Sequence, residues 1–155
     1  MAKQLCYDDV EVGTEVTSLA KIATTRTLVQ WAGATGDWYP LHYESDFAKA
    51  QGTGEPIIHG ELKLAWMIQM MVDWLGEQGR LKKLSCRFYG VDYPRKMKTL
   101  DEPKEGETWW CKGRVVKKYT QDNENFVECE IWVENGKGET TTRGAAVAIL
   151  PPRSK

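Results

Sequence analysis

The pattern of apolar and polar residues changes along the chain, from mixed segments in the first half to clear alternation in the second. In residues 62–75 apolar side chains cover most of a helix surface, which predicts one long helix that is buried nearly all round and ends at Gly76. In residues 126–135 valine, cysteine and isoleucine alternate with glutamates, which predicts a strand with one buried face.

Other segments of the chain add strands and short helices. Further strands are predicted in β-branched or alternating segments at 14–25, 83–94, 107–120 and 139–150. A short helix is expected to start after Thr27 as N-cap and to end at Gly36. A second short helix is expected with Ser45 as its cap. These elements indicate an α+β fold in which an antiparallel sheet curls around one central helix.

Size and charge narrow the class of protein. The chain has 155 residues and a net charge of −1, which predicts one domain over residues 1–150 and excludes a broad phosphate-backbone binder. Pro151 and Pro152 would stop the last strand, so 151–155 are expected to form a disordered tail. No signal segment and no apolar run of about 18 residues occurs, and the four cysteines are far apart. We therefore expect a cytoplasmic protein with reduced thiols and no nucleic-acid or membrane partner.

The stretch "GDWYPLH", residues 36–42, holds an acid and a base. Asp37 and His42 would diverge by ~140° on a helix and point to opposite faces of a strand, so they converge only on an irregular loop. Gly36 and Pro40 provide that irregularity. Near pH 7 an aspartate and a neutral imidazole can hold a water and take its proton. The residues alone leave open a capping Asp37 and a structural His42.

The stretch "PIIHGEL", residues 56–62, places Gly60 at the start of the predicted long helix. The N-terminus of a helix has unpaired N–H groups and a positive dipole end, so the Gly60 N–H is a candidate oxyanion donor. Tight packing is the alternative explanation for Gly60. His59 is expected to be a structural, hydrogen-bonding residue at the helix entrance.

Together these two stretches resemble the MaoC-like dehydratases and (R)-specific enoyl-CoA hydratases, and the likeness extends over nearly the whole chain. The resemblance implies a hot-dog fold, a homodimer or higher oligomer, and binding of acyl thioesters of coenzyme A or acyl carrier protein. It implies that Asp37 and His42 activate water and that the Gly60 N–H holds the thioester oxygen. Two positions depart from the family pattern: Tyr39 stands where Asn is usual, and Glu61 replaces a commoner apolar residue.

Aromatic and basic residues near these stretches are candidates for substrate contacts. The residues expected to line the substrate pocket are Trp38, Tyr39, Tyr43, Ile58, His59 and Trp66. The rings would suit a bulky or aromatic acyl group, with a core position as the alternative for Trp66. The candidates for binding the phosphates of coenzyme A are Lys63, Arg87, Arg95, Lys96 and Lys98, with an ordinary solvated surface position as the alternative for each.

The expected reaction is the reversible hydration of a trans-2-enoyl-CoA to the (R)-3-hydroxyacyl-CoA. Coenzyme A enters as part of the substrate, and no separate cofactor is expected. The sequence has no H-E-x-x-H or C-x-x-C spacing, so no metal is expected. Two alternatives stay open: a hot-dog thioesterase that uses Glu61, and a non-catalytic acyl-CoA-binding subunit of a heteromeric hydratase.

Overall fold

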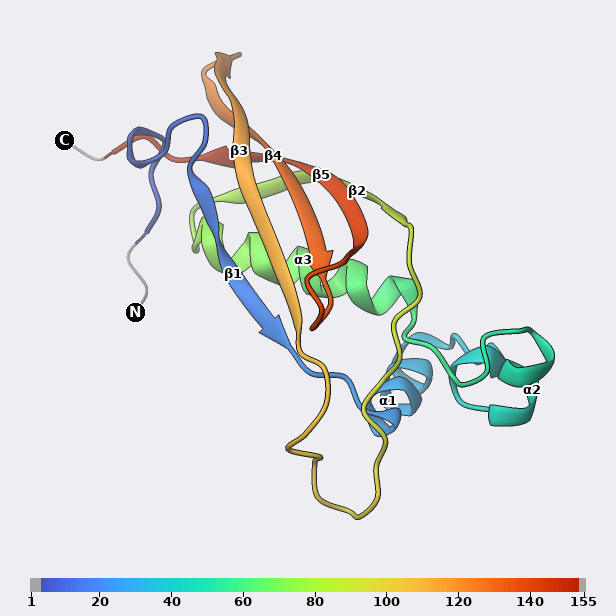
Figure 1. Cartoon of the computed structure of the whole chain (residues 1–155). Helices are drawn as coiled ribbons and strands as arrows, with labels where there is room; N and C mark the ends of the chain where they lie inside the picture. The colour runs from blue at the N-terminus through green and yellow to red at the C-terminus, as the bar shows by residue number, and fades with distance from the viewer. Residues whose placement is uncertain (1–3, 154–155) are drawn as a thin grey trace.

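A computed structural model describes residues 4–153 as an antiparallel sheet wrapped around one long helix (Figure 1). The strands, in the sheet order β1-β3-β4-β5-β2, are β1 (Glu15–Lys21), β3 (Trp109–Gln121), β4 (Glu124–Glu134), β5 (Thr140–Leu150) and β2 (Arg80–Phe88). The helices are α1 (Thr25–Thr35), α2 (Ser45–Ala50) and α3 (Gly60–Leu75), with 3-10 turns at Tyr7–Asp9 and Pro40–His42. The expected α+β fold is confirmed.

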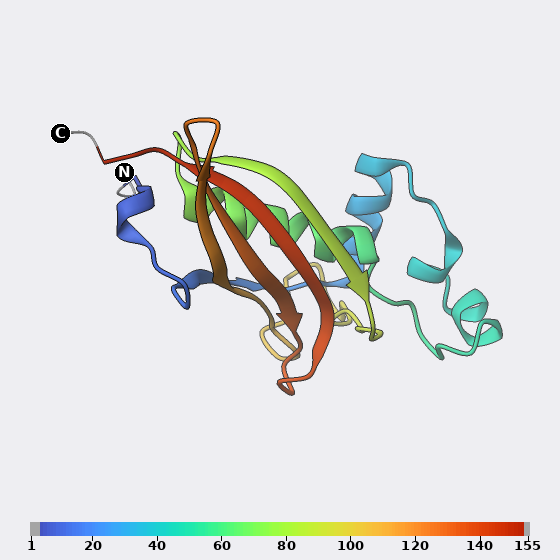
Figure 2. The same ribbon diagram turned by 90° about the horizontal axis from the view of Figure 1, so that it is seen from above.

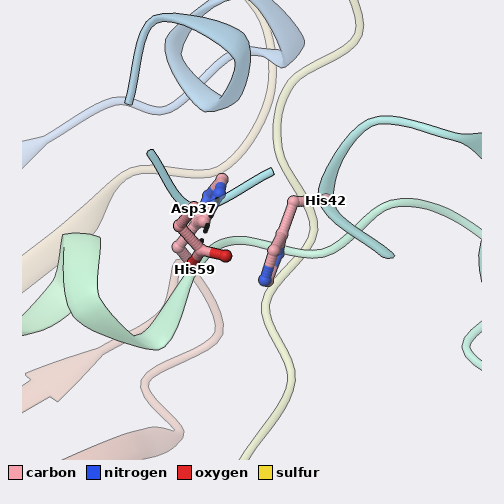
Figure 3. A group of neighbouring side chains, drawn as sticks. All are labelled: Asp37, His42 and His59. Carbon is pink, nitrogen blue, oxygen red and sulfur yellow. Dashed lines mark ion pairs between the residues drawn. The ribbon is translucent and has the colours of Figure 1, made fainter. Parts of the chain in front are cut away.

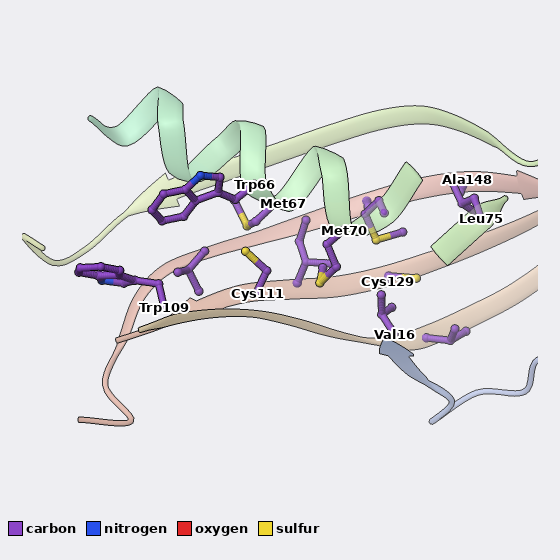
Figure 4. Packing of buried hydrophobic residues seen from close by; sticks show 14 of the residues in the cluster. Val16, Trp66, Met67, Met70, Leu75, Trp109, Cys111, Cys129 and Ala148 are labelled. Carbon is purple, nitrogen blue, oxygen red and sulfur yellow. The ribbon is translucent and has the colours of Figure 1, made fainter. Parts of the chain in front are cut away.

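The core lies between α3 and the concave face of the sheet (Figure 4). Met67, Met70 and Met71 of α3 are buried in the same cluster as Cys111 of β3 and Cys129 of β4. Burial raises the pKa of both cysteine thiols to about 12, so these side chains behave as small apolar residues and not as nucleophiles. The predicted alternation of β4 is confirmed, since its buried positions recur at every second residue.

The boundaries of the helices differ from the sequence prediction in small but explicable ways. Helix α1 begins at Thr25, because Thr24 is the N-cap and its hydroxyl accepts a hydrogen bond from the Thr27 N–H at 3.2 Å. Ser45 is the first residue of α2, not its cap. Helix α3 is not buried all round, because the side chains of Ile68 and Val72 are 39% and 51% exposed.

The C-terminal segment up to residue 153 is ordered by contacts with the first 3-10 turn. Pro151 O accepts a hydrogen bond from the Tyr7 N–H at 2.9 Å, and the Arg153 side chain pairs with Asp9. The expected disordered tail is therefore wrong for 151–153, and residues 154–155 lie outside the described part of the chain.

Helices α1 and α2 lie at the end of the molecule where α3 begins, opposite the two ends of the described chain (Figure 2). After β1, the chain therefore passes through α1, α2 and α3 before it returns to the sheet at β2. No helix within residues 4–153 combines the length and apolar content needed to cross a bilayer.

Candidate active site

The turn after α1 places the carboxylate of Asp37. Gly36 ends the helix with φ of +79°, a left-handed conformation that glycine adopts without strain, and its N–H donates to Ala32 O at 2.8 Å. Asp37 follows at once, and its Oδ1 accepts a hydrogen bond from the Tyr39 N–H at 3.4 Å. The carboxylate is 38% exposed, so it is fixed by the turn and still open to water.

His42 is the last residue of the 3-10 turn Pro40–His42, which provides the predicted irregular bend after Asp37. Its Nδ1 lies 2.8 Å from Ile57 O. Because a carbonyl oxygen only accepts hydrogen bonds, Nδ1 carries the proton in the neutral ring and Nε2 keeps a free lone pair. The contact with Ile57 therefore presents Nε2 as the basic atom of His42.

His59 is fully buried between His42 and the start of α3. Its ring stacks on that of His42, with centroids 3.7 Å apart and 18° between the planes, and its Nε2 lies 3.9 Å from Asp37 Oδ2 (Figure 3). Burial and the neighbouring His42 lower the pKa of His59, and Asp37 only partly offsets them, so His59 is neutral at pH 7. Neither ring nitrogen of His59 makes a hydrogen bond of ordinary length to a described residue, so the structural hydrogen bond expected of His59 stays a prediction.

One nitrogen or oxygen atom from each of Asp37, His42 and His59 lies within 4.8 Å of the others. Imidazole and carboxylate are also metal ligands, but an imidazole lone pair lies in the plane of its ring. Two rings stacked in near-parallel planes do not direct their lone pairs to one ion. This arrangement is better suited to holding a water molecule than a shared metal ion.

Gly60 is the first residue of α3, and the His59 side chain makes no capping hydrogen bond there. A Cβ added to Gly60 would lie 2.8 Å from the Phe88 ring, so any other residue at this position would require that ring to move. Because glycine has no side chain, no Cβ shields the first N–H of the helix. Packing and oxyanion binding are thus compatible roles for Gly60.

Two cavities reach His42. One has a volume of about 430 Å³ and is lined partly by Tyr43, Val29 and Met97. The other has a volume of about 270 Å³ and is lined by residues that include Gly60 and Phe88. His42 therefore lies where a substrate could extend in two directions from the reacting atoms.

The aromatic residues named from the sequence divide into two groups. Trp38 is 54% exposed, and its carbonyl accepts a hydrogen bond from Tyr43 Oη at 2.9 Å, so both rings stay near the Asp37 loop. Trp66 is only 6% exposed and packs in the core near Trp109, with ring centroids 6.2 Å apart. Trp66 lines neither cavity at His42, so the expected substrate contact is replaced by its alternative, a core position.

Tyr39 and Ile58 complete the expected pocket residues. The Tyr39 ring makes edge-to-face contacts with both His42 and Phe47, with centroids 6.1 and 5.5 Å apart. Where the resembled family has Asn, this chain therefore places a ring that packs against the base. Ile58 is 3% exposed and lines the smaller cavity.

Two of the five basic residues named for phosphate binding do not face solvent. Lys63 is buried and pairs with Asp92, and Arg95 is buried with its guanidinium donating to the carbonyls of 103–107. Both expectations were wrong, because each cation is already neutralised or hydrogen-bonded inside the protein. Lys96 pairs with Glu55, and Arg87 and Lys98 are exposed.

A sheet wrapped around a single helix, with an acid–base cluster where that helix begins, defines a hot-dog-fold protein with a candidate active site. The family model described as "MaoC like domain" matches residues 9–126. The chain therefore belongs to the MaoC-like dehydratase family.

Similarity to individual proteins is more distant. The chain is 34% identical over 62 residues to enoyl-CoA hydratase 2, peroxisomal, from Arabidopsis thaliana, which is 39% of this chain and 20% of that protein. It is 31% identical over 74 residues to peroxisomal multifunctional enzyme type 2 from Mus musculus, 46% of this chain and 10% of that protein. The unliganded R-hydratase PhaJ1 from Pseudomonas aeruginosa has the same fold, with a TM-score of 0.79 at 20% identity, covering 97% of this chain and 88% of that one. The chain thus spans only 20% of the length of the relative from Arabidopsis thaliana and 10% of the length of the relative from Mus musculus.

Proposed function

We propose that this protein hydrates trans-2-enoyl thioesters reversibly to (R)-3-hydroxyacyl thioesters. The observation that carries the proposal is the meeting of Asp37, His42 and His59 beside the uncapped start of α3. Membership in the MaoC-like dehydratase family and the similarity to an enoyl-CoA hydratase support this reaction class. Sequence and geometry are thus consistent with the same chemistry.

In the proposed mechanism, the Gly60 N–H donates a hydrogen bond to the thioester oxygen and stabilises the enolate. Asp37 holds a water molecule, and the free Nε2 of His42 takes its proton as the oxygen bonds to Cβ. The electrons of the Cα–Cβ double bond move onto the thioester oxygen as the enolate forms. The protonated His42 then gives its proton to Cα, which restores the thioester carbonyl and the neutral imidazole. Dehydration is the reverse sequence. His59 keeps the His42 ring in place by stacking and remains neutral throughout.

The substrate follows from the cavities that reach His42. The cavity of about 430 Å³ is in the size range of small-molecule sites, and its lining combines apolar and charged residues. Its apolar part, formed by Val29, Tyr43 and Met97, supports a bulky or aromatic acyl group. The carrier is proposed to be coenzyme A or an acyl carrier protein, bound as part of the substrate. The homodimer or higher oligomer and the cytoplasmic location stay predictions.

Glu61 would be the catalytic carboxylate of a thioesterase. Its side chain is exposed, and it lines neither cavity at His42. Glu61 also does not belong to the cluster formed by Asp37, His42 and His59. Thioester hydrolysis is therefore less well supported than hydration.

The test is a panel of short, long and aromatic trans-2-enoyl-CoA esters, followed by loss of enoyl absorbance, free thiol release and chiral analysis of the product. We expect loss of absorbance, an (R)-3-hydroxyacyl product and no thiol. Asp37→Asn should abolish most turnover, while Asp46→Asn, the same change at an exposed residue of α2, should not. Thiol release without hydration would indicate a thioesterase, and binding without turnover would indicate a non-catalytic subunit.

A further inference from the structure

A second polar cluster, formed by Lys63, Asp92 and Thr141, is buried next to the candidate active site. Lys63 Nζ lies 2.7 Å from Asp92 Oδ2, and Thr141 Oγ1 donates to the same oxygen at 2.7 Å. All three residues are less than 5% exposed. Removing an ion pair from water costs free energy, and this cost is offset only when the two charges are well placed. The short contacts within the cluster therefore restrict the positions of its three side chains.

This cluster joins the segments that surround Gly60. Lys63 is in the first turn of α3, and its Nζ also donates to Gly90 O at 3.2 Å. The main chain of Asp92 accepts a hydrogen bond from the Ile58 N–H at 2.8 Å, two residues before Gly60. The Tyr89 N–H and Gly90 N–H donate to Thr141 O at 2.9 and 3.0 Å. The segment that leads into α3, the first turn of α3 and the segment after β2 therefore meet at one ion pair.

The cluster also lies next to Phe88, the residue that packs against Gly60. Phe88, immediately before the segment held by Lys63, is the residue whose ring a Cβ at Gly60 would meet at 2.8 Å. Lys63 Nζ lies 5.8 Å from the centroid of that ring. Lys63, Phe88, Gly60 and His42 line the same cavity of about 270 Å³. A change in the position of Lys63 would therefore alter a cavity that Gly60 also lines.

We propose that the Lys63–Asp92 ion pair is a positioning device that sets the orientation of the Gly60 N–H in the oxyanion hole. This inference rests on the proposed function for its catalytic consequence. Lys63 acts through the first turn of α3, and Asp92 acts through the Ile58 N–H, so the pair fixes Gly60 from both sides along the chain. A misplacement of about 1 Å at such a donor is expected to lower kcat by about 100-fold.

The Gly60 amide can be observed by itself, because His59–Gly60 is the only His–Gly step in the sequence. Protein labelled with carbonyl-¹³C histidine and ¹⁵N glycine gives a single carbonyl–amide correlation from that step. Its chemical shift and hydrogen-exchange rate report the geometry of the donor without any substrate. This measurement separates a positioning role from a general contribution to stability.

The decisive variant is Lys63→Met/Asp92→Asn, which removes both charges and keeps an acceptor for Thr141. We expect the Gly60 correlation to move, its exchange to accelerate about ten-fold or more, and kcat to fall with little change in KM. The matched control is Lys112→Met, the same change at a lysine paired with Glu134 in the sheet. It should leave the Gly60 correlation and kcat unchanged.

Several outcomes decide the proposal. An unchanged Gly60 shift and exchange rate in the folded double variant would overturn it, whatever the activity. If the wild-type protein hydrates no enoyl thioester while the Gly60 amide still responds, the proposed function fails and the positioning role stands. If the double variant does not fold, Thr141→Val provides the test, because it removes one hydrogen bond to Asp92 and keeps both charges. An unmoved Gly60 correlation in Thr141→Val would then contradict the proposal.

Discussion

Two polar clusters adjoin the first turn of α3, and they differ in how fully their hydrogen bonds are satisfied. In the Lys63–Asp92–Thr141 cluster, opposite charges meet at 2.7 Å, and only Asp92 Oδ1 lacks a partner among the described residues. In the Asp37–His42–His59 cluster the Asp37 carboxylate lies 3.9 Å from His59 Nε2, and neither nitrogen of the buried His59 ring makes a hydrogen bond of ordinary length to a described residue. The clusters lie close together and are built for different purposes.

The comparison distinguishes two roles of polar clusters, one that fixes the structure and one that can carry out chemistry. A buried pair whose opposite charges neutralise each other is expected to affect geometry and stability when it is removed. A cluster with open lone pairs gives up stability and can bind water or a substrate atom. The four predictions below test this division, from the largest expected effect to the smallest.

The largest effect is expected on turnover when the open cluster is changed. Asp37→Asn and His42→Asn should each lower kcat/KM by about 10²–10⁴-fold, because each removes one partner of a single proton-transfer step. The double variant should be little worse than either single variant, since the two residues act together. Steady-state kinetics and thermal unfolding of all three proteins test this. Additive losses, or a large fall in stability, would contradict the assignment of this cluster to chemistry.

The next effect is on stability when the satisfied cluster is broken. Lys63→Met leaves the Asp92 carboxylate buried without its cation, and a loss of about 3–5 kcal/mol in the free energy of unfolding is expected. Lys63→Met/Asp92→Asn should recover much of that loss, because no buried charge remains. Urea unfolding measures both values. A single variant as stable as the wild type would show that Lys63 is not required as a buried partner.

A smaller effect is expected where the clusters meet, at Gly60. Gly60→Ala places a Cβ 2.8 Å from the Phe88 ring, and such overpacking costs about 1–3 kcal/mol. The Phe88 side chain is 44% exposed, so the ring can move and the lower end of this range is expected. Adding Phe88→Ala should remove the clash between the Cβ and the ring. Urea unfolding of the single and double variants decides whether the ring is the obstacle.

The smallest effect concerns the pH dependence of stability that His59 causes. Its pKa is lowered in the folded protein, so below about pH 6.5 the unfolded chain takes up the proton first and stability falls as the pH is lowered. Above that pH His59 is neutral in both states and contributes no slope. In His59→Gln the loss of stability between pH 6.5 and 5 should be smaller than in the wild type. Urea midpoints across this range measure it, and equal slopes would refute a buried neutral His59.

Much of the fold followed from local patterns in the sequence. The alternation of β4, the end of α1 at Gly36 and the start of α3 at Gly60 were predicted, because strand periodicity and the conformations of glycine are properties of short segments. The bend between Asp37 and His42 was predicted for the same reason. The N-cap of α1 was predicted as Thr27 and is Thr24. The two threonines form one capping box, and both are residue types that favour the N-cap position.

Other features depended on residues that are distant in the sequence. The stacking of His42 on His59 and the burial of Lys63 against Asp92 need segments that only the folded sheet and helix bring together. Lys63 was predicted to face solvent because a lysine ordinarily does, and nothing near it in the sequence identifies Asp92 as its partner. The sequence by itself determined the elements and the acid–base loop. Only the tertiary structure decided which polar groups pair and which stay open, because burial and pairing are set by non-local packing.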